Sequence, residues 1–242
     1  MDIIAVLHDF QQKFVDPLTA DITRTLEVTC HNSGKDNHGS NFIGNTVVLM
    51  GIEATSQFIN PHSRKELKDY LCVAKKHYAE LKSEQKKYLS RRNCPTDGSL
   101  LAKQFMKDYF DARFSVRTEL GVPLVELIWA FRNPHAHAFY PHYQKRLSND
   151  KKISGAVDWL YKDKNRKVGI TIAEIESKFD DSCVSDLYEV EGNCFRVRPQ
   201  ILFVFFKRAA TEFVSRVRND DKLQRQFLEN YERLSGLYGF VV

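Results

Sequence analysis

Residues 131–142, FRNPHAHAFYPH, bring an arginine, an asparagine and three histidines together within twelve positions. Arginine offers a planar fork of hydrogen-bond donors that matches the oxygens of a phosphate. Histidine has a reference pKa of about 6.5 and can therefore accept or donate a proton at neutral pH. These residue types can serve phosphate chemistry, bind a metal or form a polar structural corner, and their spacing bears on the choice.

The Asn133-Pro134 pair predicts the local backbone. Proline disfavours the α conformation in the residue before it, so the preceding apolar helix should end within 131–133. Asparagine is a strong N-cap and proline is favoured at the first helical position, which makes Asn133 the cap of a new helix. Arg132 and His137 then occupy the N′ and N4 positions, which meet across a helix start, whereas His135 points elsewhere.

An arginine and a histidine that converge beside a helix N-terminus suit a phosphate, because the free amides there attract anions. A structural alternative uses the same two side chains. Arg132 would cap the carbonyl groups of the preceding helix, and His137 would satisfy a buried polar group. The R-x4-H spacing is common, so this pattern alone leaves both interpretations open.

The segment WAFRNPHAHAFYP resembles the signature of the HEPN superfamily, R-x4-6-H with Asn often directly after the Arg. The upstream NTVVLMGIEATSQFI resembles an early core helix of these proteins, and FKRAATEFVSRV resembles the closing helix of bacterial members with a short β insertion. The resemblance implies a helical bundle that forms a homodimer with the two motifs facing each other. It places Arg132 and His137 at the catalytic site, with Asn133 in support; His135 and His142 match nothing invariant.

The resemblance implies that active members are endoribonucleases whose site works without a metal ion. The RNA 2′-hydroxyl attacks the adjacent phosphate, with His137 as general base or acid and Arg132 stabilising charge on the phosphoryl oxygens. The products are a 2′,3′-cyclic phosphate and a 5′-hydroxyl, and DNA is inert. A toxin or anti-phage role, with an antitoxin or other regulatory partner, also follows from the resemblance alone. The alternative is a non-catalytic helical interaction or RNA-binding module.

Two competing signals lie close to this motif. His135, His137 and His142 form an HxH-x4-H cluster, and on a strand His135 and His137 would share a face and could ligate zinc. A proline-led helix start separates these two, so we predict no metal and no cofactor. Glu126 lies on a narrow polar stripe of the preceding helix, where a solvent-facing or subunit-facing role is favoured over a catalytic one.

RNA contacts are predicted upstream and downstream of the motif. The basic run 75–92 interleaves tyrosines with positive charges, which is typical of an RNA-backbone track and also of a solvated helix face. Tyr140 could stack on a base or pack at an interface. The candidate RNA-binding residues are Lys86, Lys87, Arg91, Arg92 and Tyr140.

Composition sets broad limits. The 242 residues are 43% hydrophobic and carry a net charge of +5, which is compatible with a packed core and with a nucleic-acid partner. The five cysteines are scattered and form no CxxC pair, which indicates reduced thiols in the cytoplasm. The N-terminus lacks a basic signal-peptide region, and the longest apolar run is too short to span a bilayer.

The periodicity predicts a mainly α fold, an antiparallel HEPN-like helical bundle in one domain over 1–242. A first helix is expected over 2–27, with a kink at Pro17, and a second from an Asn45 cap to Pro61, where Gly51 and Ala54 permit close helix approach. Further helices are expected over 63–92, after 95–99 to about 114, over 122–131, and in two stretches after Pro199. Between them, 151–198 is predicted to be a small α/β insertion with β-hairpins and a capping box at TIAE.

Overall fold

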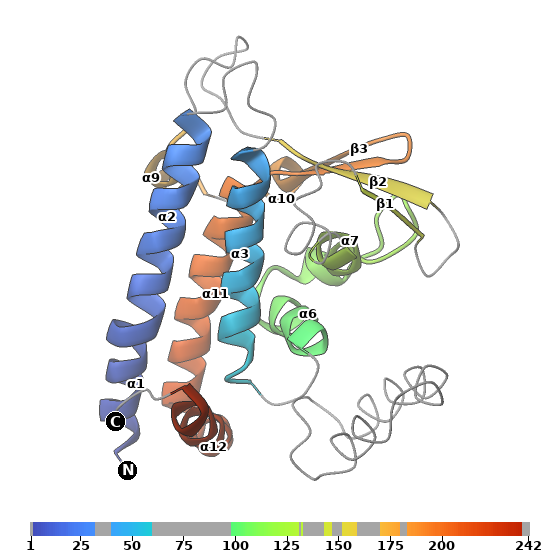
Figure 1. Ribbon diagram of the computed structural model, residues 1–242. Helices are drawn as coiled ribbons and strands as arrows, with labels where there is room; N and C mark the ends of the chain where they lie inside the picture. The colour runs from blue at the N-terminus through green and yellow to red at the C-terminus, as the bar shows by residue number, and fades with distance from the viewer. Residues whose placement is uncertain are drawn as a thin grey trace.

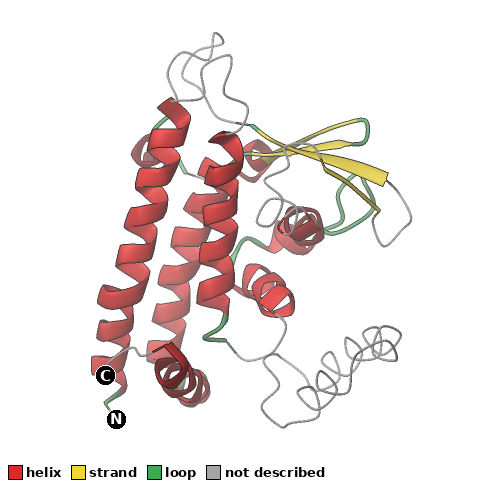
Figure 2. Cartoon of the chain, viewed as in Figure 1, coloured by secondary structure: helices red, strands yellow, loops and turns green. Residues whose placement is uncertain are grey.

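The computed structural model describes residues 2–31, 40–59, 98–130, 132, 143–146, 152–158, 170–179 and 183–238. Over these residues the chain is mainly helical, and a small sheet lies beside one end of the helices (Figures 1 and 2). None of the described helices is both long and apolar enough to cross a lipid bilayer.

The N-terminal helix is split, as Pro17 predicts. Helix α1 spans Ile3–Phe10, a π-helical turn η1 spans Gln11–Val15, and α2 spans Asp16–His31. Pro17 lies in the first turn of α2, where its missing N–H is tolerated. The π-helical turn directly before it absorbs the irregularity without ending the rod.

Helix α3 spans Ser40–Ser56, and its start differs from the predicted one. Asn45 is not the N-cap: it lies inside the helix and is only 1% exposed. The polar pair Gly44-Asn45 suggested a boundary, but the helix continues through it because its neighbouring turns pack against α2 and the C-terminal helix α11 (Pro199–Asn219). Burial in tertiary structure outweighs the local capping preference.

Gly51 is where α3 meets its neighbours most closely. A methyl group placed on this glycine would lie 2.7 Å from Ile22 Cδ1 of α2 and 3.2 Å from Phe206 Cε1 of α11. The close approach that the sequence permits at Gly51 therefore occurs within the chain.

We expect Gly51→Leu to lower the free energy of unfolding by about 1–3 kcal/mol, because the larger side chain would push α2 and α11 away from α3. Urea unfolding measures this change. The control is Val28→Leu on α2, at a position that is 59% exposed, which should change stability by less than about 0.5 kcal/mol. Equal stability of the two variants would contradict the packing described for Gly51.

Helices α6 (Gly98–Tyr109) and α7 (Leu124–Ala130) lie across the face of α3 away from α2 (Figure 1). The predicted helix to about 114 ends earlier, at Tyr109. A 3-10 turn η2, Ala112–Ser115, follows it, because the Asp111 carboxylate accepts a hydrogen bond from Arg113 N at 2.9 Å and caps a new turn. Helix α7 is buried on every side except at Glu126, as its largely apolar sequence predicts.

The C-terminal helices complete the bundle. Helix α11 packs on α3 and α6, and buries large aromatic side chains including Phe203, Phe206 and Phe213. Asp220 separates it from α12, Asp221–Tyr238, because its carboxylate accepts hydrogen bonds from Lys222 N and Leu223 N and starts a new helix.

The sheet has the order β1-β2-β4-β3, formed by Tyr143–Arg146, Lys152–Val157, Cys194–Val197 and Tyr188–Glu191 respectively. The β3–β4 hairpin is confirmed, and Gly192 takes φ +59° in its turn. The predicted insertion boundary at 151 is too late for the sheet, because β1 starts at Tyr143. Strands β2 and β4 are parallel, so a crossover joins them.

Two short helices lie within this crossover, α9 (Ile172–Ser177) and α10 (Cys183–Leu187). The predicted capping box is present: Thr171 and Glu174 exchange side-chain and backbone hydrogen bonds at the start of α9. The other hairpin predicted within 151–198 has its turn at 162–165, KDKN, and lies outside the described residues apart from β2. So does the predicted helix over 63–92.

Candidate functional site

Arg132 is the one predicted catalytic residue that the structure describes. It lies two residues beyond Ala130, the last residue of α7, and its side chain is 17% exposed. His137 and Asn133 lie outside the described residues. The predicted RNA-binding residues also lie outside them: Lys86, Lys87, Arg91, Arg92 and Tyr140.

A tight loop fixes the direction of α7 and therefore the place of Arg132. Gly121 N donates a hydrogen bond to Thr118 O at 2.8 Å, and Gly121 takes φ +80°, a conformation that glycine adopts without strain. Thr118 N and Oγ1 both donate to Val122 O. Leu124 N then donates to Val116 O at 3.2 Å, which ties the first residue of α7 to the other side of the loop.

An ion pair joins Arg132 to Glu53 of α3, across 79 positions in the sequence. The Arg132 guanidinium donates through Nη2 to Glu53 Oε2, and the Glu53 side chain is 27% exposed. Both partners are mostly removed from water, so their attraction is screened less than that of a surface pair. The pair connects the end of α7 to the last turns of α3.

Glu53 is a site residue that sequence reasoning missed, although a signal was present. It is the sole charged residue in the whole of α3, Ser40–Ser56. A single charge on a helix that packs on several neighbours needs a partner of opposite sign. Arg132 in turn is the only lysine or arginine between Arg117 and Lys145, so these two isolated charges are natural partners.

Trp129 provides a second contact for the same guanidinium. The Arg132 guanidinium carbon lies 6.0 Å from the centroid of the Trp129 ring, at the outer limit of a cation–π contact. The Trp129 side chain is itself buried, at 7% exposure. Carboxylate and indole together restrict where the guanidinium can move.

Glu126 has a charged partner on the neighbouring helix. Lys103 Nζ of α6 lies 3.0 Å from Glu126 Oε2, and the two side chains are 26% and 40% exposed. A pair this accessible contributes about 0–1 kcal/mol to stability. The structure therefore gives Glu126 a contact between α6 and α7 within the chain.

The described residues around Arg132 offer a fixed cation with a carboxylate that orients it. Such a group can bind an anion or stabilise negative charge that develops on a substrate. Within the described part of the chain, no three His, Cys, Asp or Glu side chains lie close enough together to hold a metal ion.

Comparisons with protein-family models, with curated proteins and with solved structures find no match.

Proposed function

We propose that this protein is a metal-independent endoribonuclease with a HEPN-like bundle, in which Arg132 and His137 act on an RNA phosphate. The observation that carries the proposal is the fixed position of Arg132, which Glu53 and Trp129 hold while 17% of its side chain remains accessible. A donor that is already oriented needs little reorganisation when negative charge develops on a phosphoryl oxygen. The R-N-x3-H pattern places a histidine within reach of such a group.

The proposed reaction uses the substrate's own nucleophile. The RNA 2′-oxygen forms a bond to the adjacent phosphorus as His137 takes its proton, and the bond from phosphorus to the 5′-oxygen breaks. The leaving 5′-oxygen receives a proton from the imidazolium, of the same chain or of a second copy. Arg132 stabilises the extra charge on the phosphoryl oxygens. DNA lacks the 2′-hydroxyl and is not a substrate.

A homodimer is part of this proposal, and α3 offers a surface for it. Ile43 and Met50 are 44% and 53% exposed, and they lie two turns apart on one face of the helix. Glu53 lies at the edge of the same face. A second copy packed on this stripe would bring two Arg132 side chains toward each other, which supports a composite site.

We expect Met50→Asp to convert the dimer to a monomer and to lower RNA cleavage, because a carboxylate would be buried in the interface. Analytical ultracentrifugation measures the assembly state. Ile4→Asp on α1 replaces a more exposed apolar residue, 64% accessible, and should leave the dimer intact. A Met50→Asp protein that still forms the wild-type dimer would contradict the assignment of this face.

The second candidate is a non-catalytic helical interaction or RNA-binding module. The observation that favours it is that the partner of Arg132, Glu53, belongs to the same chain. An ion pair within one chain joins α3 to the end of α7 whether or not the protein cleaves RNA. In this case the protein would act in a toxin or anti-phage system by binding RNA or a regulatory partner, without cleaving RNA.

Incubation of the purified protein with a mixed RNA pool in EDTA distinguishes the two candidates. The nuclease predicts that RNA is cut and that a DNA pool of matching sequence stays intact. A folded protein that binds RNA but cuts neither pool would favour the interaction module.

A further inference from the structure

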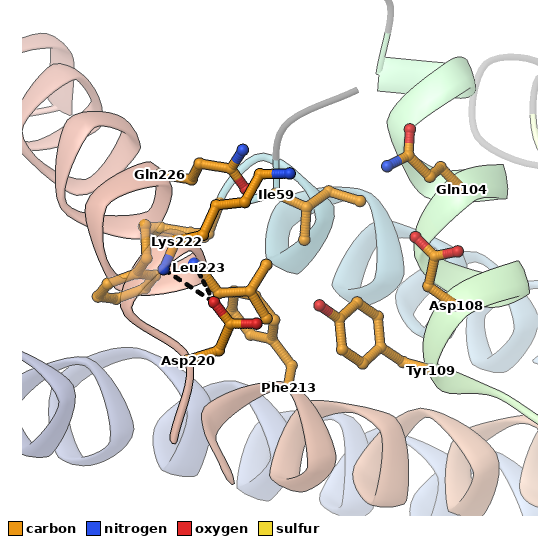
Figure 3. A pocket seen from close by; sticks show the side chains of 11 residues that line it. Ile59, Gln104, Asp108, Tyr109, Phe213, Asp220, Lys222, Leu223 and Gln226 are labelled. Atoms are coloured by element: carbon orange, nitrogen blue, oxygen red, sulfur yellow. Dashed lines mark hydrogen bonds between the residues drawn. The ribbon is translucent and has the colours of Figure 1, made fainter. Parts of the chain in front are cut away.

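A cavity of about 200 Å³ lies beside the C-terminal half of α6, between the segment that follows α3 and the junction of α11 with α12 (Figure 3). Its floor is aromatic. Phe58, Phe213 and Phe227 are at most 4% exposed, and the Tyr109 ring meets that of Phe213 edge to face at 5.4 Å. Such a floor accepts a flat or short apolar group.

Polar groups surround this floor. Figure 3 shows Asp108 and the Tyr109 hydroxyl approaching from α6, and Asp220 and Lys222 from the start of α12. Asp220 is held in place because its carboxylate accepts hydrogen bonds from Lys222 N at 2.8 Å and Leu223 N at 3.0 Å. The amides of Gln104 and Gln226 complete the rim.

Carboxylates dominate the charge around the cavity. Two carboxylates, from Asp108 and Asp220, and the ammonium group of Lys222 line the cavity, and the Lys222 side chain is exposed to solvent. Burial, followed by the charge of Asp108, raises the pKa of Tyr109 to about 12. The nearby Arg216 guanidinium, 5.1 Å from the ring centroid, opposes this shift without cancelling it. Negative charge is therefore disfavoured at the hydroxyl.

We propose that this cavity binds an organic cation, an ammonium or guanidinium group carried on a short apolar body. The apolar body rests on the aromatic floor, and the cation lies between Asp108 and Asp220 with the Tyr109 hydroxyl as a further acceptor. The ligand is either a free amine or guanidine, or an arginine side chain of a protein partner. This proposal does not depend on ribonuclease activity, since Arg132 does not line the cavity.

Three compounds with one ring and different charges test the proposal on the full-length protein: benzylamine, benzyl alcohol and benzoate. Calorimetric or NMR titration should show benzylamine binding about fivefold more tightly than benzyl alcohol, as expected for one partly shielded ion pair, with benzoate weakest. Asp108→Asn should remove most of this preference. Lys222→Gln should tighten benzylamine and weaken benzoate further, a pattern that general destabilisation cannot produce. Asp21→Asn on α2, outside the cavity, serves as the control.

Equal affinities for the three compounds, tightest binding of benzoate, or no saturable binding of benzylamine at millimolar concentration would overturn the proposal. Agmatine and a blocked Gly-Arg-Gly tripeptide then distinguish the sources of the ligand. Competition with benzylamine by both identifies a site that accepts an arginine side chain, whereas competition by agmatine alone identifies a site for a free molecule.

Discussion

Replacing His137 by alanine is expected to lower the rate of RNA cleavage by about 10²–10⁴-fold, the range that one positioned acid–base group contributes. The loss should appear in the turnover rate more than in RNA binding, because the imidazole transfers a proton and does not hold the chain. Single-turnover cleavage of a labelled RNA, with a parallel filter-binding assay, separates the two effects. Circular dichroism verifies that the variant is folded.

The sequence offers a matched control for this variant. His135 lies two residues away, and the predicted helix start directs its side chain away from Arg132, so His135→Ala should cleave RNA at a rate close to that of the wild type. Equal losses in His135→Ala and His137→Ala would contradict the predicted convergence of Arg132 with His137. They would favour a structural corner that any change disrupts.

The second large effect is expected at Glu53. Glu53→Gln leaves the Arg132 guanidinium mostly buried without its opposite charge, and we expect the free energy of unfolding to fall by about 1–3 kcal/mol. The guanidinium also loses its fixed orientation, which should lower RNA cleavage by about 10–100-fold. The matched control is Glu126→Gln, whose more exposed pair with Lys103 should cost less than about 1 kcal/mol and leave cleavage unchanged.

A charge exchange separates the role of Arg132 in catalysis from its role in stability. The double variant Glu53→Arg with Arg132→Glu restores an ion pair between α3 and the end of α7. We expect it to recover stability over either single variant and to remain inactive, because a carboxylate now faces the phosphate. Recovery of RNA cleavage together with stability would show that the pair is only structural.

Several elements could be predicted from the sequence because one local signal dominates them. The largely apolar run 122–131 predicts a buried helix, and Leu124–Ala130 form one. Gly192 with its flanking alternation predicts a hairpin turn, and β3 pairs with β4 around it. Thr171 and Glu174 form the capping box that their spacing predicts. The prediction of Asn45 as an N-cap is wrong, because this residue lies inside α3, a helix that packs on α2, α6 and α11.

The site could be predicted only in part, because its geometry depends on a contact between distant segments. The local motif is enough to identify Arg132 as a candidate site residue. Glu53 is identified only by its ion pair with Arg132, which forms when the folded chain brings α3 and the end of α7 together. The parallel pairing of β2 with β4 is equally non-local, and β1 lies outside the predicted insertion. Glu53 is the one charged residue of α3, and this isolated charge predicts a partner of opposite sign but does not identify which residue it is.

The most direct test of the central claim is the chemistry of the RNA ends produced in EDTA by the wild type, with folded Arg132→Ala and His137→Ala proteins beside it. The account predicts 2′,3′-cyclic phosphate and 5′-hydroxyl ends from the wild type and intact RNA from both variants. Intact RNA from the wild type, 5′-phosphate ends, or wild-type cleavage by either variant would contradict it.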